Sequence, residues 1–214
     1  MRSLCLFLLG TTLLQAGTTA DELIRRVETR YNAARTLSVE FVENYQMQGH
    51  PRPPEEGKLT LLKERKMRWD YVRPAGKLFI SDGKMVYVYT ADENRVERMP
   101  LRDTDDMRAP LAFLLGKLDM HKEFRDFSMH PGEGGDWLVA RSKNDRTPYE
   151  SVEMLIARDG SITHLKVAGR DQSLLEFSFK DERLNPVVSN NLFHFNIPAG
   201  ADVVDAVTFD GQEK

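Results

Sequence analysis

From residue 37 onward, apolar and polar side chains alternate in short segments, and turn residues separate these segments roughly every 8–12 residues. β-Branched and aromatic residues dominate the segments, which is typical of antiparallel strands. Asp82-Gly83 between two segments indicates a tight hairpin. The pattern predicts about ten or eleven strands, at residues 37–41, 59–62, 67–72, 78–81, 85–90, 95–101, 124–129, 137–141, 152–157, 162–167 and 174–180.

A sheet of that many strands does not stay flat, because the twist between neighbouring strands curls it towards a barrel. Helices before the sheet and in its middle then have one natural place, over the concave face or the mouth. We therefore expect a mainly β protein of the α+β class, in which a curved antiparallel sheet surrounds an apolar interior under a helical lid. Such a shape can enclose a cavity for an apolar ligand.

Two segments are predicted as helices and one as a long loop. Residues 21–36 have an apolar stripe at helical spacing, with charged residues on the other face. Residues 110–116 form an apolar segment that a proline opens and a glycine closes, which is the usual asymmetry of helix ends. Residues 50–57 contain three prolines and are predicted to lie outside the strand ladders.

The N-terminus has the pattern of a secretory signal peptide, with a positively charged start, an apolar run over residues 4–14 and small residues up to Ala20. We expect cleavage after Ala20, with cleavage after Ala16 or Gly17 as alternatives. Residues 21–214 are then a single domain, exported to the periplasm and not anchored to a membrane.

Composition and motifs give no sign of catalysis or of nucleic-acid binding. The 30 Lys and Arg residues are balanced by 33 Asp and Glu, for a net charge of −3, without the basic excess of nucleic-acid-binding domains. The single cysteine, Cys5, lies in the leader, which leaves the domain without disulfide or thiolate chemistry. The five histidines have no metal-ligand spacing, and the sequence has neither a G-x-S-x-G elbow nor a glycine loop before a helix. We expect no enzyme activity, no metal and no cofactor.

Five motifs, in chain order, resemble those of the periplasmic outer-membrane lipoprotein carrier family, LolA, and together they span nearly the whole domain. They are Trp69-Asp70-Tyr71-Val72-Arg73-Pro74 followed by Ile80-Ser81-Asp82-Gly83-Lys84; Val86-Tyr87-Val88-Tyr89; Ala109-Pro110-Leu111 to Leu115; Arg158-Asp159-Gly160-Ser161-Ile162; and the closing segment from Phe193-His194-Phe195 to Pro198-Ala199-Gly200 and Val204.

The resemblance implies an incomplete antiparallel β-barrel of about ten to eleven strands, closed by α-helices around a hydrophobic cavity. It also implies a monomeric chaperone that takes acylated lipoproteins from an inner-membrane ABC transporter of the lipoprotein-releasing type and delivers them to an outer-membrane lipoprotein acceptor. Two alternatives stay open. One is a carrier of another lipid or glycolipid, and the other is a lipoprotein-sensing regulatory module of the same fold.

Residues that line the implied acyl-chain cavity are expected on the aromatic strands. Met67, Trp69 and Tyr71 share one strand face, and a methionine-containing apolar lining suits an adaptable site. The full set of lining candidates is Met67, Trp69, Tyr71, Phe79, Tyr87 and Tyr89. The candidate lid residues are Leu111, Phe113 and Leu114.

One departure from the family concerns the latch that holds the lid closed. Many carriers of the family have an Arg-Pro pair six and five residues before the tryptophan, and its arginine bonds carbonyls of the lid. Here Lys63 occupies the place of the arginine and Glu64 that of the proline. Lysine donates hydrogen bonds but lacks the planar fork of arginine. Lys63 is therefore the candidate latch, with Arg65 as the alternative.

Overall fold

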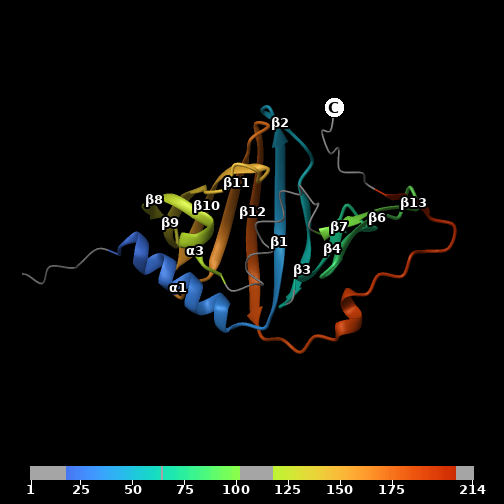
Figure 1. Ribbon diagram of the computed structural model, residues 1–214, viewed down its shortest axis with the longest axis horizontal. Helices are drawn as coiled ribbons and strands as arrows, with labels where there is room; N and C mark the ends of the chain where they lie inside the picture. Colours follow the sequence, from blue (N-terminus) through green and yellow to red (C-terminus); the bar gives the residue numbers. More distant parts are fainter. Residues whose placement is uncertain (1–17, 64, 102–117, 206–214) are drawn as a thin grey trace, which may run out of the picture.

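The computed structural model describes residues 18–63, 65–101 and 118–205, and the strands in this part of the chain form one curved sheet (Figure 1). The prediction of a mainly β protein is confirmed. In chain order the elements are α1 (Ala20–Ala33), β1 (Thr36–Met47), β2 (His50–Pro51), β3 (Glu55–Leu62), β4 (Lys66–Arg73), β5 (Lys77–Asp82), β6 (Met85–Thr90), β7 (Arg95–Pro100), α3 (Met120–Glu123), β8 (Phe124–Gly132), β9 (Gly135–Ser142), β10 (Tyr149–Ala157), β11 (Ile162–Gly169), β12 (Ser173–Leu184), the 3₁₀ helix η3 (Asn190–Phe193) and β13 (Asp202–Asp205).

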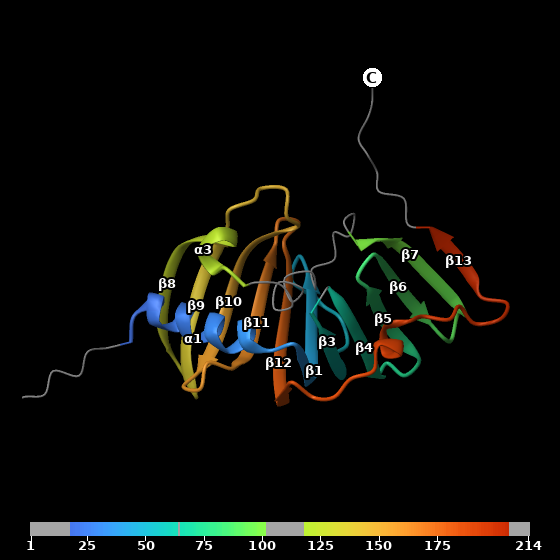
Figure 2. The same ribbon diagram turned by 60° about the horizontal axis from the view of Figure 1, so that its bottom comes forward.

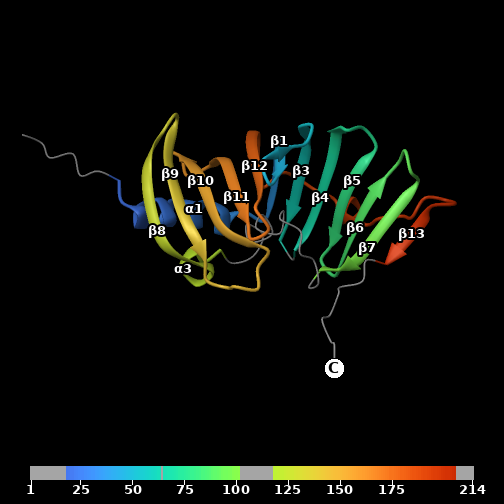
Figure 3. The ribbon, with the colours of Figure 1, turned by 90° about the horizontal axis from the view of Figure 1, so that it is seen from above.

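The sheet has the order β13-β7-β6-β5-β4-β3-β1-β12-β11-β10-β9-β8, with β2 paired to β1 beside this path. Neighbouring strands are antiparallel except β13, which is parallel to β7. The two end strands, β13 and β8, do not pair with each other, so the sheet is an unclosed barrel (Figure 3). The expected incomplete barrel is therefore confirmed.

The predicted strand segments all lie within observed strands apart from Leu101, which falls just beyond β7, but the sheet has two more strands than expected. One is β2, inside the stretch 50–57 that we predicted as a loop. Pro51 takes part there because β2 is a two-residue edge strand that pairs with the end of β1 alone. The same stretch also contains the start of β3. The other addition is β13, which pairs with β7 in parallel. Hairpin signals in the sequence indicate antiparallel neighbours only and so do not predict this strand.

The N-terminal helix starts one residue earlier than predicted and ends three residues earlier, at Ala33, so that Thr36 already belongs to β1. Thr19 caps the helix in a capping box. The Thr19 hydroxyl accepts from the Glu22 amide, and the Glu22 carboxylate accepts from the Thr19 amide. Cleavage of the leader after Ala16 or Gly17 would keep this cap, whereas cleavage after Ala20 would remove it.

We call the face of the sheet on which α1 packs the inner face and the opposite face the outer face. Helix α1 crosses the half of the sheet formed by β8 to β12, where Leu23, Ile24 and Val27 are buried (Figures 1 and 2). The predicted helix at residues 110–116 lies outside the described residues.

The segment after β12 covers part of the outer face. It leaves the long central strand, passes β4 and β5 through η3, and ends in β13 (orange-red in Figure 2). Phe193 of η3 and Ile80 of β5 are both fully buried, although neither belongs to the core on the inner face. The Arg68 guanidinium, on the outer face of β4, donates to the Leu192 carbonyl at 3.1 Å. We call residues 185–205 the C-terminal strap.

Candidate functional site

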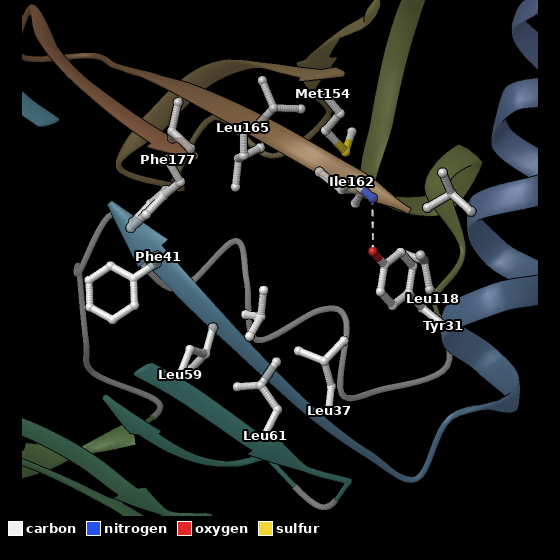
Figure 4. Close-up of a cluster of buried hydrophobic side chains, with 14 of the residues drawn as sticks. Tyr31, Leu37, Phe41, Leu59, Leu61, Leu118, Met154, Ile162, Leu165 and Phe177 are labelled. Carbon is white, nitrogen blue, oxygen red and sulfur yellow. Dashed lines mark hydrogen bonds between the residues drawn. The ribbon is translucent and has the colours of Figure 1, made fainter. Parts of the chain in front are cut away.

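The inner face is apolar across the described sheet from β8 to β6. Strand registers align its residues in rows, for example Val39 beside Leu59, Leu59 beside Trp69, and Trp69 beside Phe79. The rows continue on the other side of β1, where Phe177 of β12 pairs with Leu165 and Leu165 pairs with Met154. Figure 4 shows Leu59 from one half of the sheet, Met154, Leu165 and Phe177 from the other, and Tyr31 from α1 around the same interior. They belong to one core cluster.

Four of the six predicted lining residues lie together on this face. Met67, Trp69 and Tyr71 of β4 are 2%, 0% and 6% exposed, and Phe79 of β5 is 2% exposed. The alternation along β4 is clear because the residues between them are charged, so the parity of the strand could be deduced from the sequence.

Aromatic rings form the centre of the face. The Phe41 ring of β1 meets Trp69 edge-on, with 4.8 Å between centroids, and Tyr71 edge-on at 5.3 Å. Phe177 lies 5.5 Å from Trp69 and 6.4 Å from Phe41. Edge-to-face pairs of this kind are worth about 0.5–1.5 kcal/mol beyond the area they bury. Phe41 and Phe177 were not among the predicted lining residues, although the period-two pattern placed Phe41 in a strand.

The other two predicted lining residues, Tyr87 and Tyr89, lie on the outer face, and their placement in the cavity was wrong. In the register of β5 and β6, Tyr87 pairs with Ile80 and Tyr89 with Leu78, while Val88 pairs with Phe79. The two tyrosine rings pack on Phe195 of the C-terminal strap, at 5.4 and 5.9 Å. The sequence could not decide the parity of β6, because residues 85–89 are apolar or aromatic on both faces.

Helix α1 is tied to the sheet by a polar cluster at Tyr31. The Tyr31 hydroxyl donates to a Glu182 carboxylate oxygen at 2.7 Å. It also accepts from the Ile162 amide at 2.9 Å, the bond drawn in Figure 4. The Arg30 guanidinium also donates to Glu182, at 2.6 and 2.9 Å, and lies 3.3 Å from a carboxylate oxygen of Asp159. Burial and the neighbouring Glu182 carboxylate hold the pKa of the Tyr31 phenol well above its ordinary value. The apolar spacing in the sequence included Tyr31, but nothing in it indicated these partners.

A second set of contacts joins the end of α1 to two other parts of the chain. The Asn32 side-chain amide donates to the Leu118 carbonyl at 2.9 Å and accepts from the Leu118 amide at 2.7 Å. The predicted latch residue Lys63 donates from Nζ to the Asn32 carbonyl at 2.6 Å. The alternative latch, Arg65, is exposed in a turn with φ of 64°. The candidate lid residues Leu111, Phe113 and Leu114 lie outside the described residues.

Polar groups also occur at one end of the inner face. Glu43 of β1 is 4% exposed, and the Tyr71 hydroxyl donates to its carboxylate at 3.4 Å. Lys77 forms an ion pair with Glu55, and its ammonium lies 4.5 Å from the centre of the Tyr71 ring. Glu43, Glu55 and Lys77 were not predicted, because a charged residue in an alternating strand looks the same in sequence whether it is exposed or buried.

Beneath α1, Tyr31, Leu37 and Leu59 line a small cavity of about 10 Å³, near the size that holds a single water molecule. Among the described residues, no group of three or more His, Cys, Asp or Glu side chains could hold a metal ion. No helix in the described part of the chain is long and apolar enough to cross a membrane.

The family profile described as outer membrane lipoprotein carrier protein LolA matches residues 32–196. The chain belongs to the LolA family. Two relatives, each named outer-membrane lipoprotein carrier protein, come from Bordetella avium and Methylococcus capsulatus. The first is 29% identical over 73% of this chain and 74% of its own length, and the second is 28% identical over 89% and 90%. A crystal structure of an uncharacterized conserved protein from Thermus thermophilus shares the fold, with a TM-score of 0.51 and 16% identity over 87% of this chain and 99% of that chain.

We predict that Tyr31→Phe lowers the free energy of unfolding at neutral pH. We also predict that the free energy of unfolding of the variant falls less steeply than that of wild type as the pH rises above about 10. Loss of the hydroxyl leaves the buried Ile162 amide without its acceptor, which costs about 1–3 kcal/mol. Because the pKa of Tyr31 is raised in the folded state, its contribution is complete below about pH 10, the ordinary pKa of tyrosine, and is lost as the pH rises above it. Urea unfolding at pH 7 and pH 10.5 measures both effects.

The difference in unfolding free energy between wild type and Tyr31→Phe should therefore shrink at pH 10.5. Tyr149→Phe is the comparison: burial raises the pKa of its phenol as well, so its difference should also shrink, but the substitution leaves the hydrogen bonds to Glu182 intact. A gap for Tyr31→Phe that is the same at the two pH values would contradict the prediction.

Proposed function

We propose that this protein carries acylated lipoproteins by binding their acyl chains on the inner face. The observation that supports the proposal most is the continuous apolar face of an open sheet, with the aromatic cluster of Phe41, Trp69, Tyr71 and Phe177 at its centre. Membership of the LolA family supports the same cargo. In this proposal the protein is a periplasmic monomer that receives lipoproteins from an inner-membrane ABC transporter and delivers them to an outer-membrane acceptor.

The energetics explain why such a carrier is needed. Burial of one CH₂ group from water contributes about 0.8 kcal/mol, so a lipid anchor with several chains does not leave a membrane for water at a useful rate. The inner face offers hydrocarbon, aromatic and thioether groups as a substitute for the membrane. Met67 and Met154 lie on it, and their flexible side chains can adapt to chains of different shape.

The described lining is closed, so binding requires the inner face to part from its cover. Ties that such an opening would break include the hydrogen bonds of Tyr31 and Arg30 to Glu182 and that of Lys63 to the Asn32 carbonyl. We propose that Lys63 takes the part of the family's latch arginine, because it bonds a carbonyl in the last turn of α1. Each such bond contributes about 0.5–3 kcal/mol, which keeps closure reversible.

The direct test uses the purified mature protein with a fluorescent fatty-acid probe. A triacylated lipopeptide should displace the probe, whereas the same peptide without acyl chains should not, because only the chains fit the apolar face. Displacement by a glycolipid and not by the lipopeptide would favour a carrier of another lipid. If the probe does not bind at all, the proposal fails and only the fold remains.

A pair of variants on neighbouring strands should separate the two faces of the sheet. Phe79→Gln puts an amide on the inner face and should weaken probe binding about tenfold, since burying an unpaired amide costs on the order of 1–3 kcal/mol. Tyr89→Gln makes a similar change under the C-terminal strap and should leave probe affinity unchanged. Thermal unfolding checks that both variants are folded at the assay temperature. Equal effects on probe affinity would count against the inner face as the binding site.

If Lys63 holds the cover closed, its replacement should increase the affinity for the probe. Lys63→Met removes the bond to the Asn32 carbonyl and should raise probe affinity about 2- to 10-fold, because a larger fraction of molecules is then open. Lys63→Arg keeps a donor and should behave like wild type. Titration of the fluorescent probe measures both constants, and unchanged affinity in Lys63→Met would exclude Lys63 as a latch.

A further inference from the structure

Trp69 has a buried hydrogen-bond donor that the fold does not use. Among the side chains of the described residues, its indole Nε1 is the one buried nitrogen or oxygen for which no hydrogen-bond partner exists. The side chain is fully buried, at the centre of the inner face. A donor left unsatisfied in this way is rare in folded proteins and calls for an explanation.

On the sides where its neighbours are known, Trp69 is surrounded by hydrocarbon side chains. Leu59 and Phe79 are its partners on β3 and β5. Phe41 and Phe177 cover it with their rings, at 4.8 and 5.5 Å. None of these side chains carries an oxygen or nitrogen that could accept the indole proton. Phenylalanine would pack on the same neighbours without the cost of an unpaired N–H, although its smaller ring would leave part of the space empty.

The indole group donates and does not accept, so it selects one kind of ligand atom. An acyl chain brings such an atom, because its ester or amide carbonyl is an acceptor without a proton. The hydrocarbon chain that follows the carbonyl suits the apolar residues around Trp69. A free hydroxyl or ammonium group would have to bury a donor of its own on this face.

We infer that the Trp69 indole N–H donates a hydrogen bond to a carbonyl oxygen of the bound acyl chain, and that this bond makes the site prefer acyl chains to alkyl ether chains of equal length. The inference rests on the proposed function and adds to it a specificity-determining residue. Because the Trp69 indole N–H has no protein partner to give up, the bond should favour the ester about 2- to 10-fold.

The test compares a hexadecanoyl monoester of glycerol with the hexadecyl monoether of glycerol. The two differ in the carbonyl alone and share chain length and headgroup. Wild type should bind the ester about 2- to 10-fold more tightly, Trp69→Phe should bind both equally, and Trp137→Phe should keep the wild-type ratio. Trp137 is a matched control because it is the other tryptophan of the chain and lies on the outer strand face beside His130 and Lys166.

A second measurement does not alter Trp69 and so decides the question even if Trp69→Phe fails to fold. In ¹⁵N-labelled Trp137→Phe protein, a single indole N–H resonance remains, that of Trp69. The ester should shift this resonance downfield, as expected for an N–H that gains an oxygen acceptor, and the ether should not.

The outcomes separate the inference from the function beneath it. If neither lipid binds wild type, the proposed acyl-chain function fails and the inference fails with it. If both bind with equal affinity, or shift the resonance equally, the carrier function stands and the indole bond is refuted. In that case the proton is held by an N–H···π contact with a ring such as Phe41, whose edge-to-face geometry permits one.

Discussion

An open sheet with one apolar face must keep that face from water without closing on itself, and much of this structure follows from that constraint. A closed barrel would remove the strand edges, but a ligand could then enter only through its ends. Here β13 and β8 stay apart, so the inner face is covered by other elements, among which α1 buries Leu23, Ile24 and Val27. The cover is held by the hydrophobic effect, which has no direction and permits sliding and separation more readily than a strand ladder does.

Leaving the barrel open creates two sheet ends, and each has features that discourage pairing with another chain. At one end, β8 has a break in register, a left-handed residue at Asp126, and Pro131, which has no amide proton to offer. At the other, β13 is four residues long and has an aspartate at each end. The C-terminal strap adds a further protection, because it covers the outer face of β4 and β5 while delivering β13 to the edge.

The strand pattern was predictable where the two faces of a strand differ in polarity. In β4, Met67, Trp69 and Tyr71 alternate with charged residues, and all three lie on one buried face, as their spacing predicts. In β6, both faces are apolar, since one meets the inner core and the other meets Phe195 of the strap. Tyr87 and Tyr89 were therefore assigned to the wrong side. Long-range contacts could not be predicted either. The hydrogen-bond partners of Tyr31 lie in β11 and β12, far along the chain, and no local sequence pattern indicates them.

Under the proposed function, the closed lining also sets the strength of binding. Phe41, Trp69 and Phe177 are already buried against one another and their cover, so an acyl chain that reaches them replaces contacts that the protein makes with itself. The net affinity is then the difference between two hydrophobic burials, each large, and not the full transfer energy of the chain. A difference of this kind is what a carrier needs, because a rigid preformed cavity would bind a lipid anchor too tightly for release. The net binding free energy is then small, because the two hydrophobic contributions largely cancel. A single hydrogen bond, such as the one inferred for the Trp69 indole, is therefore large enough to decide which chains are bound.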